Sequence, residues 1–298
     1  MRTRFQLSLL SLALLVGLTA SPARAQTGPD QSAELSTLGD LLDRIPNLAP
    51  FALPGFLPKG MFRFYSSPHF GDLVHKDYMR VPVGMRVTSS PSTTEYVEVE
   101  GYFTHGLGDP AGYGFDRLRT GFKYEPPPAP GTTRGVAWST GFDFLTPLSR
   151  PPAELSDGHQ HFSPYVAKSV VLVPDAKLIG FGSIGIDLLN HTALPPNFGE
   201  NQLHSNSIQT SFGVVRDWKH FRGTLTASYG TTVLMSDEHH QFFGIRPAIG
   251  MPLNRFSGRR TRLLLALGAY SVWGPDGNDV GLSTSLRVDF VYASGERK

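Results

Sequence analysis

The chain has 298 residues with 32 Gly, 24 Pro and no Cys, and only 17% of its residues are charged, against roughly 25% in soluble domains. The lack of Cys excludes a disulfide framework, and 40% hydrophobic residues exclude a disordered chain. The net charge of +2 gives no global sign of nucleic-acid binding, so no nucleic-acid partner is expected.

Residues 1–25 have the pattern of a bacterial export signal. Arg2 and Arg4 precede an apolar run over 7–20, and Ala23-Arg24-Ala25 forms an A-x-A cleavage site. The run is too short for the alternative, a membrane anchor. Cleavage after Ala25 is expected, and it leaves 24 basic and 25 acidic residues, a net charge of −1.

The next segment, 26–60, differs from the rest of the chain. Apolar residues follow a helical spacing over 35–45, before Pro46, and an apolar stretch follows over 51–57, with Pro54 inside it and Pro50 and Pro58 at its ends. A short helix and an apolar arm are expected here. The arm is either a mobile tail or a segment that folds into the main domain, 61–298, and narrows it.

From Met61 onward the hydrophobic pattern has a period of two residues, typical of strands with two unlike faces. Most of the segments reach the roughly 9–11 residues that a tilted strand needs to cross a membrane. Twelve strands are expected, at 61–67, 78–89, 95–105, 116–126, 133–147, 160–174, 176–190, 206–218, 221–234, 241–254, 260–273 and 279–292.

The connections between these strands alternate in length. Tight ones are expected at 90–94, 127–132, 174–175, 217–220 and 255–259, and longer ones at 68–77, 148–159 and 191–205. Outer-membrane barrels have short periplasmic turns and longer outer loops. The expected fold is therefore all-β: a twelve-stranded antiparallel transmembrane β-barrel with a short N-terminal helix and apolar arm. A soluble periplasmic β protein, the alternative, has no reason to sort its loops in this way.

Aromatic residues lie on the apolar face near both strand ends, as in the girdles of membrane barrels; the alternative is that aromatics simply favour strands. The near-periplasmic set is Phe62, Tyr124, Trp218, Phe221, Phe290 and Tyr292, and the outer set is Phe103, Phe142, Phe144, Phe243 and Trp273.

The opposite face carries most of the charged residues at membrane depth, where only the barrel interior tolerates them. This face is interpreted as pore-lining, either a salt-bridged filling or a narrow polar path that slightly favours anions. Its basic residues are Arg63, Arg80, Arg86, Arg117, Arg119, Lys123, Arg222, Arg246, Arg262 and Arg287. Its acidic residues are Glu98, Glu100, Glu125, Asp143, Asp187 and Asp289.

Nine of the ten histidines fall in the expected outer loops or strand tops. The densest groups contain His159 and His161, and His239 and His240. Because His binds Zn, Cu or Ni and titrates near neutral pH, metal binding and pH-sensitive loop packing are both hypotheses for these four residues; polar outer loops that simply tolerate His are the alternative.

Catalysis finds little support in the sequence, and neither an enzyme nor a cofactor is expected. Hydrolase, metalloprotease and phosphate-loop motifs are absent. His161 and Ser163 match the His-x-Ser spacing of outer-membrane phospholipase A, but no Asn follows at a fitting distance.

Four stretches resemble an outer-membrane barrel family linked to phenol degradation, the MetA-pathway type. They are 106–109 (GLGD), 121–124 (GFKY), 141–147 (GFDFLTP) and 162–169 (FSPYVAKS). The resemblance implies a channel-like barrel in the bacterial outer membrane that passes small hydrophobic or aromatic solutes. Its partners would then be outer-membrane lipid, a small-molecule solute and the barrel-assembly machinery during biogenesis. A surface metal binder and a purely structural barrel are the alternatives.

Overall fold

The computed structural model describes residues 61–66, 69–70, 78–90, 92–104, 113–126, 136–149, 158–193, 205–218, 220–237, 239–253, 261–274 and 277–293. The expected signal and N-terminal arm, 1–25 and 26–60, lie outside these ranges. None of the described segments forms a helix long and apolar enough to cross a membrane.

The described regular structure is a single antiparallel sheet, and each of the twelve expected strands has a counterpart in it. The strands are β1 (Met61–Ser66), β2 (His69–Phe70), β3 (Tyr78–Ser90), β4 (Thr93–Thr104), β5 (Tyr113–Tyr124), β6 (Val136–Pro147), β7 (Gln160–Val173), β8 (Leu178–Asn190), β9 (Ser207–Asp217), β10 (Arg222–Thr231), β11 (Gln241–Pro252), β12 (Thr261–Gly274) and β13 (Gly277–Ala293).

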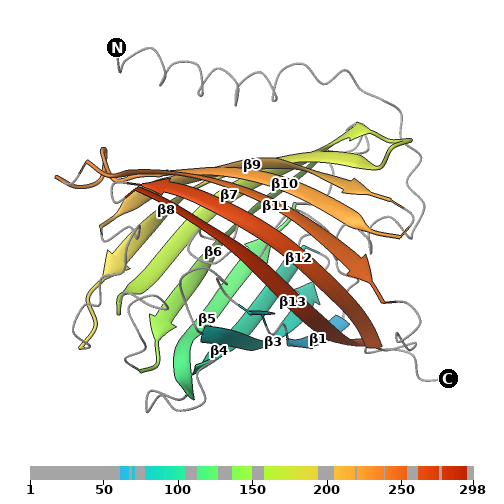
Figure 1. Ribbon diagram of the computed structural model, residues 1–298, viewed down its shortest axis with the longest axis horizontal. Coiled ribbons are helices and arrows are strands. Elements are labelled where there is room, and N and C mark those ends of the chain that lie inside the picture. The colour runs from blue at the N-terminus through green and yellow to red at the C-terminus, as the bar shows by residue number, and fades with distance from the viewer. Residues whose placement is uncertain are drawn as a thin grey trace.

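The first expected strand contains both β1 and β2, which pair with the same two neighbours, β3 and β13. The register is continuous, since Phe62 lies opposite Val87 and His69 lies opposite Arg80. The ladder therefore runs from β3 to β13 and through β1 and β2 back to β3. Figure 1 shows the strands wrapped around one axis with a strong tilt. The expected twelve-stranded antiparallel barrel is confirmed.

The two faces of the sheet invert the usual distribution of polarity. Outward positions carry exposed apolar side chains in mid-strand, such as Ile184 and Leu267, each 55% exposed. Among the described residues, the buried side chains are more often polar or charged than hydrophobic, and Thr226 and Asp143 are 4% and 6% exposed. A water-soluble fold buries its apolar side chains, so this outer surface is suited to a hydrocarbon environment.

Aromatic side chains lie on the outward face at both ends of the strands. Tyr124, Trp218 and Phe221 are exposed near the tight turns, and Phe103 and Trp273 are exposed near the opposite end. Trp218 stacks on Phe221 with ring centroids 4.7 Å apart. Of the other expected girdle residues, Phe142, Phe144 and Phe243 are half-buried, whereas the side chains of Phe62, Phe290 and Tyr292 lie outside the described part.

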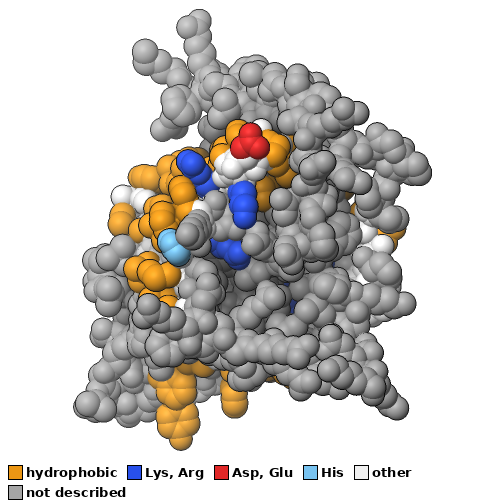
Figure 2. Space-filling model, turned by 90° about the vertical axis from the view of Figure 1, so that its right-hand side faces the viewer, with side chains coloured by type: hydrophobic (Ala, Val, Ile, Leu, Met, Phe, Trp, Pro, Cys, Tyr) orange, Lys and Arg blue, Asp and Glu red, His pale blue; other side chains and the backbone are white. Residues whose placement is uncertain are grey.

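The tight turns gather at the end of the barrel that also holds Met61 and Ala293. The turn between β7 and β8 closes through the Lys177 N–H, which donates to the Pro174 carbonyl oxygen at 3.0 Å. Figure 2 shows this end: among the described side chains, basic ones lie near the middle and hydrophobic ones mostly surround them. Most of the longer connections fall largely outside the described residues.

Inward aromatic rings lie over glycines of the next strand. Tyr96 is the register partner of Gly121, and Tyr102 is the partner of Gly114; Phe181 is likewise the partner of Gly213. A Cβ atom added to any of these glycines would meet the opposing ring closer than real Cβ contacts allow. Glycine therefore lets each ring lie flat against the wall.

The Gly121→Ala substitution is expected to lower the free energy of unfolding by about 1–3 kcal/mol, because the new methyl group must displace the Tyr96 ring. The matched control is Gly182→Ala, whose Cβ would meet its nearest heavy atom, the Ser211 carbonyl oxygen, at 3.7 Å. The free energy of unfolding of each variant is measured by urea unfolding in lipid vesicles. Equal stability of the two variants would contradict close ring–glycine packing.

Candidate functional site

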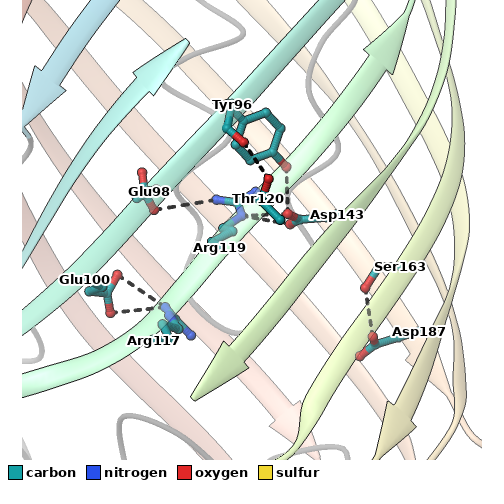
Figure 3. A network of polar contacts seen from close by, with 9 residues as sticks. All are labelled: Tyr96, Glu98, Glu100, Arg117, Arg119, Thr120, Asp143, Ser163 and Asp187. Carbon is teal, nitrogen blue, oxygen red and sulfur yellow. Dashed lines mark hydrogen bonds and ion pairs between the residues drawn. The ribbon is translucent and has the colours of Figure 1, made fainter. Parts of the chain in front are cut away.

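The inward face of β4, β5 and β6 carries a network of buried ionic side chains (Figure 3). At its centre, Arg119 Nε donates to both oxygens of Asp143, at 3.0 Å and 2.8 Å. The Tyr96 hydroxyl donates to Asp143 Oδ1 at 2.6 Å. Arg119 Nη1 also lies 4.0 Å from Glu98 Oε1. We call Tyr96, Glu98, Arg119 and Asp143 the central network.

A β-bulge places two consecutive residues of β5 on the inside. Glu100 pairs with Arg117 and Gly101 pairs with Phe115, so Asp116 is the extra residue. Asp116 is completely buried, and its Oδ2 lies 3.5 Å from Arg117 Nε. Arg117 also reaches Glu100 Oε1 at 3.2 Å. The bulge thus adds an acidic side chain to the lumen that strict alternation would have put outside.

Two further basic residues extend this charged wall toward the tight turns. Lys123 Nζ lies 2.6 Å from Glu125 Oε1, and both side chains are buried. The Arg86 guanidinium lies over the Tyr96 ring, 5.5 Å from its centroid. Strands β3 to β6 together therefore carry a row of charged side chains, most of them in ion pairs, along one side of the lumen.

A second polar cluster lies on β7 to β9, near the long connections. Asp187 accepts hydrogen bonds from the Ser163 hydroxyl at 2.8 Å and from Gln209 Nε2 at 3.3 Å. Its Oδ2 also lies 2.9 Å from His161 Nδ1. Because the Ser163 hydroxyl is directed at the carboxylate, His161 is not placed as the base that would activate it as a nucleophile.

The four histidines of the metal hypothesis lie in different surroundings. His159 Nε2 lies 3.2 Å from His191 Nδ1, while His161 contacts Asp187. His239 is exposed and His240 half-buried in the connection between β10 and β11. Among the residues that the structure describes, no group of three or more His, Asp or Glu side chains could hold a metal ion. Metal binding by these histidines stays a prediction.

On the wall formed by β8 to β12, many of the described inward side chains are small or carry hydroxyls. Ser183 and Ser211 are register partners whose hydroxyl oxygens lie 2.6 Å apart. On β10, Thr224, Thr226 and Ser228 face inward and are buried. The described charged side chains that face inward from β9 to β12 are Arg222 and Arg246, and the register partner of Arg222 on β9 is Asp217.

Ten of the fifteen residues predicted to line a pore have described side chains, and all of them lie on the inward face: Arg86, Glu98, Glu100, Arg117, Arg119, Lys123, Asp143, Asp187, Arg222 and Arg246. The side chains of the other five lie outside the described part, namely Arg63, Arg80, Arg262, Arg287 and Asp289. Their backbone register is nevertheless known. Arg63 lies opposite Arg86, and Arg262 lies opposite Asp289.

Sequence reasoning missed several inward residues. Asp116 was missed because the bulge shifts the alternation, and a charged residue beside Arg117 on a strand was the only available signal. Tyr96 was missed because its inward ring rests on Gly121, a pairing that only the register reveals. Thr224 and Thr226 were missed because alternation places them on the polar face but gives no sign of a site there.

No protein-family model and no curated protein matches the chain, so the resemblance to the MetA-pathway type is not confirmed. Among solved structures, the NanC porin is 10% identical with a TM-score of 0.48, over 77% of this chain and 98% of that chain. An outer membrane channel from Pseudomonas putida F1 is 11% identical with a TM-score of 0.48, over 79% and 97%. The KdgM porin, solved with disordered oligogalacturonate, is 9% identical with a TM-score of 0.42, over 78% and 98%.

Proposed function

We propose that this chain is a bacterial outer-membrane channel that lets a small solute pass passively through its lumen. The observation that carries the proposal is the inverted polarity of the sheet, with apolar side chains exposed outside and charged ones buried inside. Such a sheet is stable in hydrocarbon only if its backbone N–H and C=O groups are hydrogen-bonded to one another. The strand pairings run around the whole barrel and provide these hydrogen bonds.

The distribution of charge supports a slight preference for anions. The paired acids and bases of β3 to β6 neutralise one another, as in the Arg119–Asp143 and Arg117–Glu100 pairs. Over the whole inward register predicted from the sequence, ten basic residues face six acidic ones. A permeating anion would therefore meet a slightly positive potential in the lumen.

The test of the channel function is conductance in planar lipid bilayers. Purified full-length protein in KCl is expected to give discrete current steps, and a salt gradient is expected to give a reversal potential displaced toward that of chloride. A correctly folded barrel without current steps would contradict a channel and favour the structural alternative.

A finer proposal is that the solute is hydrophobic or aromatic, as the resemblance to the phenol-degradation barrels implies. Phenol added to the bath is then expected to interrupt the open-channel current, whereas glycerol at the same concentration is not. Identical current traces with both solutes would argue against an aromatic solute.

We also propose export with cleavage after Ala25, assembly by the barrel-assembly machinery and contact with outer-membrane lipid. The apolar Leu7–Ala20 run and the Ala23-Arg24-Ala25 site support the cleavage. N-terminal sequencing of protein purified from membranes is expected to begin at Gln26. The same preparation is expected to need detergent for extraction.

The orientation of the barrel can be tested with single cysteines, because the chain contains none of its own. Asp237 and Asp175 are both exposed, the former in the connection between β10 and β11 and the latter in a tight turn at the opposite end. A membrane-impermeant maleimide on intact cells is expected to label the Asp237→Cys variant. The Asp175→Cys variant should react only after the outer membrane is permeabilised; the reverse pattern would overturn the orientation.

A further inference from the structure

Two threonines on the inward face of β10 have buried hydroxyls that lack a hydrogen-bond partner. Thr224 is 6% exposed and Thr226 is 4% exposed, and neither Oγ1 atom contacts a donor or acceptor. Because the two residues are separated by one position, both hydroxyls belong to the same stripe of the lumen wall.

Several other hydroxyls of the barrel are satisfied, although the buried Ser139 hydroxyl on β6 also lacks a partner. On the outward face, Thr120 donates to the Tyr96 carbonyl oxygen and Thr140 donates to the Tyr165 carbonyl oxygen, each at 2.9 Å. The inward Ser228 donates to the Gly244 carbonyl oxygen at 3.4 Å. Buried polar groups without partners are rare in native proteins and need a reason. The preference of threonine for strands does not explain two unsatisfied hydroxyls at adjacent inward positions of one strand.

The surroundings of Thr226 contain a guanidinium on one side and an aromatic ring on the other. Its register partner on β11 is Arg246, whose Cζ atom lies 5.4 Å from the centroid of the Tyr270 ring. Its partner on β9 is Gly213, against which the Phe181 ring lies. Arg246 and Tyr270 are only half-buried, so the site opens on the lumen.

The contact with the Tyr270 ring keeps the Arg246 guanidinium beside Thr226. Guanidinium groups bind carboxylates through two parallel hydrogen bonds, and neutral hydroxyls donate to the remaining lone pairs of the same carboxylate. The Phe181 ring adds an apolar surface for the carbon body of a ligand.

We propose that Thr224, Thr226 and Arg246 form a binding site for a small organic carboxylate in the lumen, an inference that rests on the proposed channel function and names its solute class. A neutral molecule of the same shape would lack the charge that the guanidinium recognises. The site would therefore slow and select passing anions rather than hold them permanently.

The test measures binding of benzoate and of benzamide, its neutral analogue, to the full-length barrel in detergent by isothermal titration calorimetry. The wild-type barrel is expected to bind benzoate at least about tenfold more tightly than benzamide. Arg246→Gln should lose this preference, and the Thr224→Val/Thr226→Val double variant should bind benzoate about tenfold more weakly. The matched control is Arg216→Gln, which removes one outward-facing guanidinium that lies over Trp218 and should leave benzoate binding unchanged.

Folding of each variant is checked by the heat-dependent shift of its band on a denaturing gel. The double valine variant is expected to fold as well as the wild type, since it removes hydroxyls that have no partner. Equal binding of benzoate and benzamide, or full benzoate binding by the folded double variant, would overturn the inference. Absence of current steps in bilayers would overturn the channel function instead, so the two failures are distinguishable.

Discussion

Replacing Asp143 by alanine is expected to lower the free energy of unfolding of the barrel by about 3–5 kcal/mol. Asp143 is 6% exposed and accepts hydrogen bonds from Arg119 Nε and from the Tyr96 hydroxyl. Without the carboxylate, the central network keeps a buried guanidinium that has lost its main anionic partner. The measurement is urea unfolding of the barrel reconstituted in lipid vesicles, followed by tryptophan fluorescence.

Two variants apportion this effect. Asp143→Asn keeps an oxygen that can accept the hydrogen bond from the Tyr96 hydroxyl, but it removes the negative charge. An intermediate loss of unfolding free energy is therefore expected. Tyr96→Phe removes only one hydrogen bond and should cost about 1 kcal/mol. If Asp143→Ala were no less stable than Tyr96→Phe, the Arg119–Asp143 pair would contribute nothing, and the ionic wall would be solvated rather than buried.

Replacing Ile184 by arginine is expected to lower the free energy of unfolding in vesicles by about 2–4 kcal/mol, the cost of a basic side chain at the bilayer midplane. Ile184 lies in the middle of β8 on the outward face and is 55% exposed. In a water-soluble β protein the same change at an exposed position would alter stability by only about 0.5 kcal/mol. The size of the loss in unfolding free energy therefore distinguishes a strand that faces hydrocarbon from one that faces water.

Val173→Arg is the matched control for depth. Val173 is also outward-facing and exposed, but it is the last residue of β7, next to the turn at 174–177. An arginine near the interface costs only about 0–1 kcal/mol. Equal losses at Val173 and Ile184 would mean that the effect comes from the strand itself and not from a hydrocarbon layer.

The strands and their two faces could be predicted from the sequence because alternation along a strand is a local property. The expected segments 78–89 and 241–254, for example, correspond to β3 (Tyr78–Ser90) and β11 (Gln241–Pro252). The inward position of Asp143 followed from its place between two outward phenylalanines. The choice between a soluble and a membrane β protein rested on the same alternation combined with loop lengths.

Features that depend on how neighbouring strands align could not be predicted from the pattern within one strand. The bulge at Asp116 arises from the register between β4 and β5, which no alternation within β5 specifies. The partner of His159 is His191 rather than His161, because His159 and His161 lie two residues apart while β8 brings His191 beside His159. The site around Thr226 combines side chains from β8 to β12, whose alignment is set by four successive pairings.

The strand that contains β1 and β2 lies between β3 and β13, so the two ends of the barrel segment are neighbours in space. Met61 lies opposite Ala293, close enough for a few added residues to join them. The domain should therefore accept circular permutation, with new termini opened in the tight turn at 174–177. A second consequence concerns the sheet edges: pairing of the first strand with the last leaves no free edge in the described sheet on which another chain could add a strand.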